Sequence, residues 1–367
     1  MTDREKEILN IIRKDPMISQ KDIAEILGIT RSSVAVHIAN LMKKGAVKGK
    51  GYVLDDEIYV SVIGGCNMDI SGAPFGRLSG RDSNPGSVTF SPGGVGRNIA
   101  ENMALMGLSV KLISVVGDDE NGRRLLEDTR ASGVDVSHVR KLAGEATGTY
   151  LSVLDENMDM YVAVSSMEIY GKFDSSYLQE KKSLIERSKV SVFDANLSYE
   201  VIETALGMAQ NNMKYLDTVS MAKALRIKDL IGRFDCIKPN RLEAEALTGI
   251  PAKDHSGLLR NAEHFHGLGV SKVFISLGPD GTFFSDGTDR GILRALKVDV
   301  RSATGAGDAF LAGAAYAETE ALDIRAAALF GTGASLMNLA SGDTINKNTN
   351  VESINKIMEG NYEIIRI

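Results

Sequence analysis

The first fifty residues carry apolar positions at the spacing of three short helices. The first helix should end before Pro16, because the α conformation is disfavoured in front of a proline. A second helix is expected between Ser19 and Gly28, and a third between Thr30 and Gly45, each with a capping residue at its start and a glycine at its end. The buried positions that we predict are Ile8, Leu9, Ile11, Ile12, Ile23, Ile26, Leu27, Val34, Ile38, Leu41 and Met42.

Helices two and three follow each other at the separation of a helix-turn-helix, and residues 46–54 form two β-prone pieces around a Gly-Lys-Gly turn. This segment resembles the winged helix-turn-helix domains of bacteria over residues 2–54. The resemblance implies that the third helix enters the major groove of duplex DNA and that the wing contacts phosphates. A packing or dimerisation module is the alternative. The candidate DNA-binding residues are Arg31, Ser32, Ser33, His37, Lys48 and Lys50.

The charge of the chain is divided unevenly. Residues 1–54 carry a net charge of +4, whereas the whole chain carries −6, so the remainder carries −10. A basic head on an acidic body indicates that only the head could meet nucleic acid. The 367 residues are enough for two domains, and we place their boundary between residues 1–57 and 58–367.

Several classes of protein are disfavoured by composition. No apolar run approaches the roughly 18 residues of a membrane span, and the charged N-terminus does not read as a signal peptide. Cys66 and Cys236 lie far apart in no metal-ligand spacing, which argues against a disulfide scaffold or a zinc finger. We therefore expect a cytoplasmic protein without a membrane partner.

The remainder of the chain alternates short apolar runs with segments of helical period. Such alternation predicts an α/β fold with a mainly parallel sheet that is covered by helices on both faces. Residues 149–164 break the pattern and read as a hairpin in a small separate β layer. The runs expected as strands of the main sheet are 58–63, 110–116, 190–194, 213–217, 236–238 and 272–277.

Ligands of open α/β sheets bind beyond the carboxyl ends of the strands, so the turns there should carry the chemistry. In residues 302–317, small side chains allow the backbone N–H groups of Gly305, Ala306 and Gly307 to converge at the start of a helix as an anion hole for phosphate. Asp308 follows in the first helical turn, where it could accept a proton from an attacking hydroxyl. Its alternative is an ordinary helix N-terminal acid.

Three further turns offer polar groups. The pair Gly93 and Gly94 precedes a helix, and the side chain of Asn98 could reach back toward a ligand. Asn67 and Asp69 follow the first strand of the sheet and suit vicinal sugar hydroxyls. In a fourth turn, Asn240 and Glu243 lie one helical turn apart, and Glu243 could orient Mg²⁺ through water. Each of these turns also has an ordinary reading, as a local Asx turn or a solvated helix start.

Taken together, these turns resemble the ribokinase-like (PfkB) carbohydrate and nucleoside kinases over about residues 59–358. Residues 93–107 (GGVGRNIAENMALMG) resemble the first signature of that family, and residues 302–310 (SATGAGDAF) resemble its more specific second signature. Within the family, residues 83–98 and 238–250 are most similar to bacterial pseudouridine kinases. The resemblance implies a ribokinase-like fold with a small β lid, formed by about residues 71–92 and 149–164.

The resemblance also implies roles for the residues of the four turns. Asp308 becomes the catalytic base, with Gly305, Ala306 and Gly307 as the anion hole, and Mg²⁺ and the phosphates of ATP are organised by Asn240 and Glu243. Relatives that bind a monovalent cation have Asp where Ser302 stands, which puts potassium activation in doubt. The family also implies substrate contacts at Asn67, Asp69, Gly93, Gly94 and Asn98, and nucleotide contacts at Ser276, Gly278, Gly281 and Thr332.

The expected reaction is the transfer of phosphate from ATP to the 5′-hydroxyl of a nucleoside, with pseudouridine as the first choice. We expect the protein to be a homodimer. A kinase of other nucleosides or of ribose or fructose is the nearest alternative. A transcription regulator that keeps the kinase fold as a ligand sensor is the other. Retention of Asp308 with Asn240 and Glu243 favours an active kinase, since a sensor has no need of a base.

Overall fold

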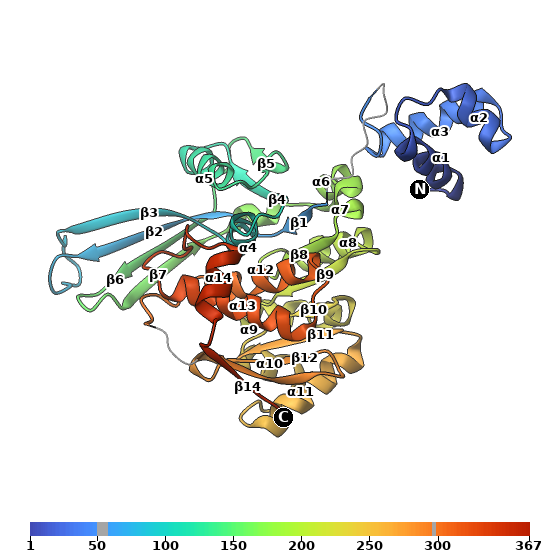
Figure 1. Cartoon of the computed structure of the whole chain (residues 1–367). Coiled ribbons are helices and arrows are strands. Elements are labelled where there is room, and N and C mark those ends of the chain that lie inside the picture. The colour runs from blue at the N-terminus through green and yellow to red at the C-terminus, as the bar shows by residue number, and fades with distance from the viewer. Residues whose placement is uncertain (50–57, 296–298) are drawn as a thin grey trace. The chain divides into compact units, whose positions relative to one another are not determined.

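The computed structural model describes residues 1–49, 58–295 and 299–367. The chain divides into two compact units, Met1–Ile58 and Tyr59–Ile367, which we call the head and the body (Figure 1). Lys50 and most of the expected wing lie outside the described residues. In the part of the chain that is described, no helix has the length and apolar character needed to cross a membrane.

The head contains three helices around a small apolar core. They are α1 (Asp3–Lys14), α2 (Gln20–Leu27) and α3 (Arg31–Lys43), and each begins with a side-chain cap, from Thr2, Ser19 and Thr30 respectively. The core is built mainly from the predicted positions. Two of those predictions were wrong: the side chains of Ile26 and Met42 are 61% and 47% exposed, because each lies one position away from the buried stripe of its helix.

The body is built on a ten-stranded sheet with the order β14-β13-β12-β11-β10-β9-β8-β1-β4-β5. All neighbours from β11 to β5 run parallel, and β12, β13 and β14 extend one edge in antiparallel fashion. The strands are β1 (Val60–Ile63), β4 (Val110–Gly117), β5 (Val139–Leu142), β8 (Val190–Asp194), β9 (Met213–Asp217), β10 (Cys236–Ile237), β11 (Lys272–Ser276), β12 (Thr282–Ser285), β13 (Arg290–Ala295) and β14 (Tyr362–Ile365).

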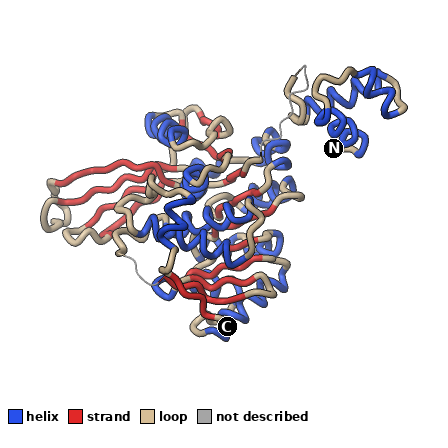
Figure 2. The backbone as a smooth tube through the Cα atoms, viewed as in Figure 1, coloured by secondary structure: helices blue, strands red, loops and turns tan. Residues whose placement is uncertain are grey.

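Helices cover both faces of this sheet, as Figure 2 shows. Alternate side chains of the parallel strands join opposite cores: Val62 packs into one and Ile63 into the other. The first core is covered by α4 (Val95–Leu105), α5 (Glu120–Ala131), α12 (Ala306–Thr319), α13 (Ile324–Leu339) and α14 (Val351–Met358). The second is covered by α6 (Ser175–Glu180), α7 (Lys182–Arg187), α8 (Tyr199–Met208), α9 (Met221–Arg226), α10 (Arg241–Thr248) and α11 (His255–Leu268). The predicted mainly parallel, doubly covered α/β fold is confirmed.

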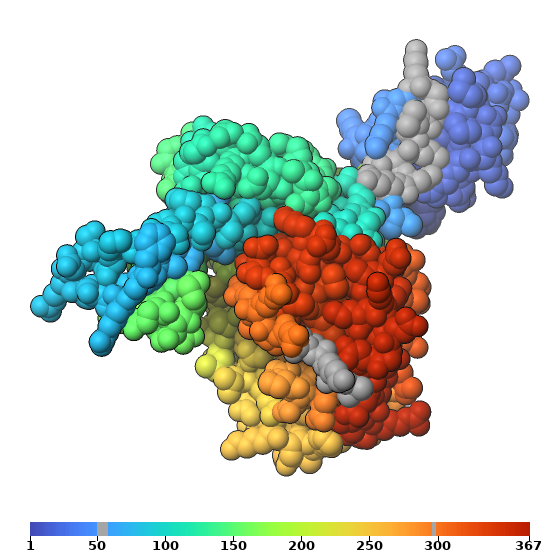
Figure 3. Space-filling model, turned by 60° about the vertical axis from the view of Figure 1, so that its left-hand side comes forward, coloured from blue at the N-terminus to red at the C-terminus, as the bar shows by residue number. Residues whose placement is uncertain are grey.

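A second, four-stranded sheet projects from the body, as the space-filling view shows (Figure 3). Its order is β3-β2-β6-β7, with β2 and β3 antiparallel, β2 and β6 parallel, and β6 and β7 forming a hairpin. The strands are β2 (Asn67–Pro74), β3 (Gly86–Gly93), β6 (Thr149–Leu154) and β7 (Met160–Ser166). We call this sheet the lid sheet. Because β2 begins at Asn67, the lid sheet starts where β1 of the main sheet ends.

Candidate active site

Charged side chains gather at the carboxyl ends of the central parallel strands. Asp194 is the last residue of β8, Asp217 is the last residue of β9, and Lys238 follows β10 directly. All three side chains are buried. The helices α4 and α12 begin beside the same ends, so the site is formed by strand ends and helix starts.

The start of α12 is open. Gly305, in the left-handed region at φ +77°, caps this helix without any side-chain hydrogen bond. A Cβ at Gly305 would lie 2.2 Å from the carbonyl oxygen of Thr344, so the close approach of these two backbones requires glycine. Asn338 of α13 donates hydrogen bonds to the carbonyl oxygens of both Gly305 and Thr344. No side chain caps this helix start, so the N–H groups of Ala306 and Gly307 are left as donors, as an anion site needs.

Asp308 lies in the first turn of α12 and faces the other elements of the site. Asn98 of α4 donates a hydrogen bond of 2.9 Å from Nδ2 to Asp308 Oδ2. Burial and the nearby charge of Asp217 raise the pKa of Asp308 to about 8, against the lowering effects of Asn98 and Lys238. A carboxylate with a pKa near neutrality is suited to accept a proton from an alcohol.

Lys238 brings a cation to the same place. Its Nζ lies 3.3 Å from Asp217 Oδ2, and a Cβ at Gly307 would lie 3.1 Å from that nitrogen. The negative charges of Asp217, Glu243 and Asp308 raise the pKa of Lys238 against the effect of burial, so the ammonium form persists. A positive charge thus lies beside the open start of α12, where it adds to the attraction for an anion.

Asn67 and Asp69 lie together at the start of the lid sheet. Asn67 Nδ2 donates a hydrogen bond of 2.6 Å to Asp69 Oδ1. Gly93 pairs with Asn67 across the sheet, and a Cβ at Gly93 would lie 2.3 Å from Asp69 Oδ2. Burial raises the pKa of Asp69 to about 6. The carboxylate of Asp69 is half-buried, which leaves room for a hydroxyl group of a ligand.

The start of α4 is closed, unlike that of α12. Gly94, at φ +98°, caps α4, and a Cβ there would lie 2.6 Å from the carbonyl oxygen of Gly65. Asp194 Oδ2 accepts hydrogen bonds of 2.7 Å from the N–H groups of both Gly65 and Gly96. Gly94 and Asn98, which were predicted as substrate contacts, are thus placed by a buried carboxylate that ties the loop after β1 to α4.

The predicted nucleotide residues lie at the ends of β10 and β11. Asn240 and Glu243 form a reciprocal capping box at the start of α10, and Glu243 also accepts a hydrogen bond of 2.7 Å from Thr218. Asn240 pairs with Ser276 across the strand ends, since Ser276 N donates to the carbonyl oxygen of Pro239. The turn after Ser276 contains Gly278 and Gly281, both at positive φ.

Two of the remaining predictions concern single hydroxyl groups. Thr332 is buried within α13, and its Oγ1 has no hydrogen-bond partner among the described residues. Ser302 lies just before the open start of α12, where its Oγ accepts a hydrogen bond from Thr304 N.

Both carboxylate oxygens of Glu243 accept hydrogen bonds within the protein. Among the described residues, no group of three His, Cys, Asp or Glu side chains is arranged to hold a metal ion. Direct coordination by Glu243 therefore finds no support here, and a Mg²⁺ ion that arrives with nucleotide phosphates would meet Asp217 and Glu243 only through water, since Mg²⁺ keeps much of its hydration shell.

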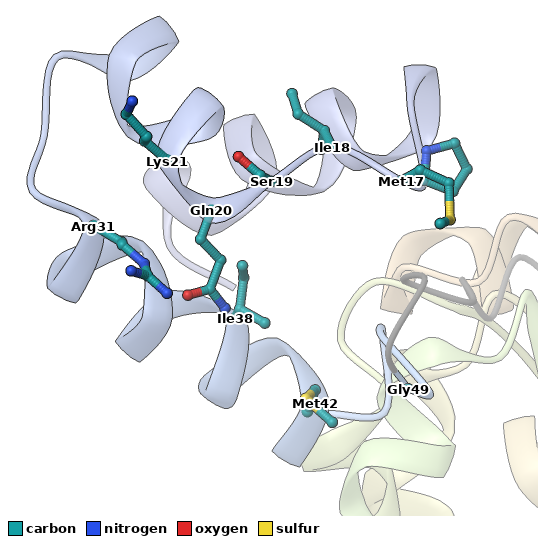
Figure 4. Close-up of a pocket in the computed structure, with 10 residues that line it drawn as sticks. Met17, Ile18, Ser19, Gln20, Lys21, Arg31, Ile38, Met42 and Gly49 are labelled. Carbon is teal, nitrogen blue, oxygen red and sulfur yellow. The ribbon is translucent and has the colours of Figure 1, made fainter.

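In the head, the candidate DNA-binding residues lie at the start of α3. Arg31 and Ser32 are exposed, and the hydroxyl groups of Ser32 and Ser33 both pair with Thr30. His37 is half-buried and Lys48 is exposed. A groove of about 580 Å³ runs beside Arg31 over an apolar floor, and Figure 4 shows the side chains of Arg31 and Gln20 pointing toward one another across it. The residues that line it include Gln20, Lys21, Arg31, Ile38 and Met42.

Sequence reasoning did not single out Asp194, Asp217 or Lys238. The signal was present, because both aspartates end apolar strands and the lysine follows a third strand. It also missed Arg97, a buried cation beside Asn98. Arg97 could have been found from the sequence, because it is a charged residue inside the apolar stripe of a predicted helix.

Comparisons with known proteins match both parts of the chain to known families. Residues 57–350 match the model of the pfkB family carbohydrate kinases, and residues 1–48 match a winged helix-turn-helix DNA-binding model. The chain is 37% identical over 302 residues to the pseudouridine kinase of Escherichia coli, which covers 82% of this chain and 96% of that protein. It is also 37% identical to the uncharacterized sugar kinase YeiI of the same organism, across 94% of this chain and 96% of the relative. That share exceeds the body alone, so the similarity to YeiI includes most of the head.

Solved structures give the same fold. A putative sugar kinase from Clostridium perfringens superimposes with a TM-score of 0.77 at 34% identity and covers 85% of this chain and all of its own. A ribokinase from Arabidopsis thaliana, solved with ribose and ATP, superimposes with a TM-score of 0.73 at 20% identity over 83% of this chain and 99% of its own. The chain therefore belongs to the PfkB family of carbohydrate kinases and is an ATP-dependent phosphotransferase that carries a winged helix-turn-helix head.

Proposed function

We propose that this kinase transfers the γ-phosphoryl group of ATP to the 5′-hydroxyl of a nucleoside, and that pseudouridine is its preferred acceptor. The observation that carries the reaction is the hydrogen bond between Asn98 and Asp308 at the open start of α12. The raised pKa of Asp308 and the nearby charge of Lys238 support its role as the base. The 37% identity to a pseudouridine kinase over 82% of this chain supports the choice of acceptor.

In the proposed reaction, Asn67 and Asp69 bind ribosyl hydroxyls and direct the 5′-oxygen toward Asp308. Asp308 accepts the proton of that hydroxyl while the 5′-oxygen of the nucleoside forms a bond to the γ-phosphorus. The bond between this phosphorus and the bridging oxygen of ADP breaks at the same time. The N–H groups of Ala306 and Gly307 and the ammonium of Lys238 stabilise charge on the phosphoryl oxygens. Asp217 and Glu243 would hold Mg²⁺ through water, and the ion would supply positive charge that neutralises the nucleotide phosphates.

The substrate assignment is tested with ATP and a panel of acceptors, by measuring kcat/KM for each. Pseudouridine should give the highest value, with phosphate at the 5′-position in the product. A higher kcat/KM for uridine, cytidine, inosine, ribose or fructose would replace pseudouridine but leave phosphoryl transfer standing. Absence of ATP turnover with every acceptor, while ligands still bind, would favour a sensor.

The lid sheet supports a second part of the proposal, a homodimer. Alternation along its strands places Asp69 and Ser71 on a polar face, and the opposite face carries apolar side chains in register across all four strands. Several of these side chains are 41–62% exposed. The apolar rows are Phe90–Ile70–Leu151–Val164 and Val88–Gly72–Val153–Val162.

An exposed apolar sheet face favours burial against another surface, and we assign it to the lid sheet of a second copy. Val162→Asp together with Val164→Asp should convert a dimer to a monomer in sedimentation experiments. Ser87→Asp, on the polar face of the same sheet, is the control and should leave the dimer intact. A wild-type protein that is monomeric at micromolar concentration contradicts this assignment.

We also propose that the head binds duplex DNA through α3 and the wing. Its +4 charge and the exposed Arg31 and Lys48 support the proposal, and Gln20 and Lys21 beside Arg31 add further polar groups. Binding should weaken with added salt, and replacing Arg31, Lys48 and Lys50 together by Ala should flatten that dependence. The measurement is fluorescence anisotropy with DNA from upstream of the protein's own gene.

A matched control removes the same charge from the acidic body, through Arg124→Ala, Lys182→Ala and Lys253→Ala. This variant should bind DNA as the wild type does. Absence of binding by the wild-type protein at low salt would leave the head as a packing module.

A further inference from the structure

Arg97 is the largest side chain that is buried in the body, and the proposed reaction does not use it. It lies on α4 immediately before Asn98, with 2% of its surface exposed. Its guanidinium donates hydrogen bonds to three neighbours besides Asn98. They are the carbonyl oxygen of Pro92 at 3.1 Å, Thr129 Oγ1 at 3.2 Å, and the carboxylate of Glu101, which also pairs with Lys347.

The contact between Arg97 and Asn98 decides how the amide of Asn98 is turned. Arg97 Nη1 donates a hydrogen bond of 3.1 Å to Asn98 Oδ1. A guanidinium has only donors, so it accepts no hydrogen bond and requires the oxygen of the amide on its side. The NH₂ group of Asn98 is thereby turned toward Asp308 Oδ2, 2.9 Å away. With the amide reversed, its oxygen would face the carboxylate and repel the ionised form.

We infer that Arg97 is a positioning residue, which holds the amide of Asn98 as a donor to Asp308 and links this hydrogen bond to Pro92 at the base of the lid sheet. The inference rests on the proposed role of Asp308 as the base. Arg97 acts through Asn98 and has no assigned contact with substrate.

Other charged groups around Asp308 also affect its pKa. Asp194 at the end of β8 and Asp217 at the end of β9 raise the pKa of its carboxyl, while Lys238 after β10 and the Asn98 hydrogen bond lower it. Loss of the Asn98 donor, whether direct or through Arg97, should therefore raise that pKa further. The pH at which activity appears should move upward.

The experiment compares the pH profile of kcat/KM for wild type, Asn98→Ala, Arg97→Met and Arg97→Lys. We expect Asn98→Ala and Arg97→Met to move the ascending limb upward by about one unit, which lowers kcat/KM at pH 7 about tenfold and restores much of it above the limb. Arg97→Lys keeps the charge without the fork and should fall between these variants and wild type. Arg123→Lys, at an exposed arginine paired with Glu120 and Glu127, is the matched control and should change nothing.

Removing Arg97 alone leaves the buried carboxylate of Glu101 without its main partner, which could unfold the protein. The double variant Arg97→Met with Glu101→Leu removes both charges and keeps the test open. A purely structural role would lower activity by one factor at every pH and leave the limb in place, and that result overturns the inference. A further shift when Arg97→Met is added to Asn98→Ala would show that Arg97 acts on Asp308 by another route, which also overturns it.

A second readout does not depend on catalysis. Infrared difference spectra can follow the protonated carboxyl of Asp308, identified by its loss in Asp308→Asn, as pH is raised. Its titration should move upward in the Arg97 and Asn98 variants even if the protein phosphorylates none of the acceptors. Failure of the proposed function is thus distinguished from failure of the positioning role, for which the titration would be unchanged.

Discussion

The helices α4 and α12 meet at Asp308, and both begin with a glycine cap, but the surroundings of the two caps differ. Both α4 and α12 are capped by a glycine in the positive φ region with no side-chain cap. At the start of α4, the N–H of Gly96 donates a hydrogen bond to the carboxylate of Asp194, and the N–H of Arg97 donates one to the carbonyl oxygen of Gly65. At α12, the carbonyl oxygen of Thr344 lies close to Gly305, the ammonium of Lys238 near Gly307 can only donate, and no side chain caps the helix.

The difference separates positioning from binding. A helix start that is satisfied by an internal carboxylate has no capacity left for an anion, so α4 can only hold side chains such as Asn98 in place. A helix start that is left open keeps its partial positive charge for a ligand. In the proposed reaction, the first signature of the family thus forms a support for Asn98, and the second forms the phosphate site.

The largest effect on activity should come from a substitution of Asp308, which lies on α12 and accepts a hydrogen bond from Asn98 of α4. Asp308→Asn keeps the contact with Asn98 but cannot accept a proton, so kcat should fall by ~10² or more while ATP binding is retained. Turnover is measured under saturating substrates, and nucleotide binding by calorimetry.

The control for this variant is Glu352→Gln, which removes an exposed acid from the first turn of α14. It should behave as wild type, because a helix dipole effect alone does not alter turnover. Full activity of Asp308→Asn would remove this residue from its assigned role.

The second prediction sets the two helix starts against each other. Gly96 and Gly307 are both the second residue of their helices, yet a Cβ at Gly96 would lie 2.7 Å from the backbone of Gly64, whereas at Gly307 it would meet only the end of Lys238. Gly96→Ala should therefore destabilise the fold by about 1–3 kcal/mol or more. Gly307→Ala should leave the melting temperature nearly unchanged and lower kcat/KM for ATP about tenfold, because its methyl group enters the anion site.

Thermal unfolding and steady-state kinetics on both variants check this contrast. The comparison between the two helices fails if Gly96→Ala loses activity without loss of stability, or if Gly307→Ala unfolds.

The parts of this site that sequence could predict are those with local signals. The turns at Gly305–Asp308 and Gly93–Asn98 are visible because glycines, a capping position and a helical period occur together within a few residues. Asp194 and Asp217 were missed because their role depends on which strands become neighbours, and pairing between β8 and β9 is a long-range property. The strands β12 to β14 were missed for a related reason, since antiparallel edge strands lack the alternation with helices that marked the rest.

Exposure was also mispredicted at single positions. Ile26 and Met42 fit the helical period of the head, but a three-helix unit of this size buries only one narrow stripe on each helix. Apolar residues at the margin of that stripe stay on the surface.

The third prediction concerns the effect of Asp217, at the end of β9, on the pKa of Asp308. A base with a pKa of about 8 must lose its proton before it can act, so kcat/KM should rise with pH up to about 8 and level off above it. Asp217→Asn removes a negative charge that raises the pKa of Asp308, and the limb should move to lower pH, opposite to the shift expected for Asn98→Ala. An exposed neutralisation, Asp343→Asn, is the control and should leave the limb unmoved.

The smallest effect should appear in stability and has the opposite sign to the effect on turnover. The pKa of Asp308 is about 8 in the folded chain and near 3.8 in an unfolded one, so the unfolded state releases this proton first as pH rises. An aspartate at this position therefore lowers the free energy of unfolding as pH rises from about 4 to about 8, and this destabilisation is complete above about pH 8. Asparagine has no proton to release and avoids the burial of a charge.

Asp308→Asn should thus melt several degrees higher than wild type at pH 8, and the difference should shrink at pH 6 and approach a constant value above pH 8. Differential scanning calorimetry at pH 6, 8 and 9 measures it. Burial also raises the pKa of Asp194, at the end of β8, but the N–H groups of Gly65 and Gly96 oppose that effect by donating to its carboxylate. An amide satisfies these donors less well, so Asp194→Asn should instead lower the melting temperature. Opposite signs for the two variants are what the proposed support and binding site require, since the carboxylate of Asp194 is paired with the start of α4 and, in the proposed reaction, that of Asp308 is kept for the substrate.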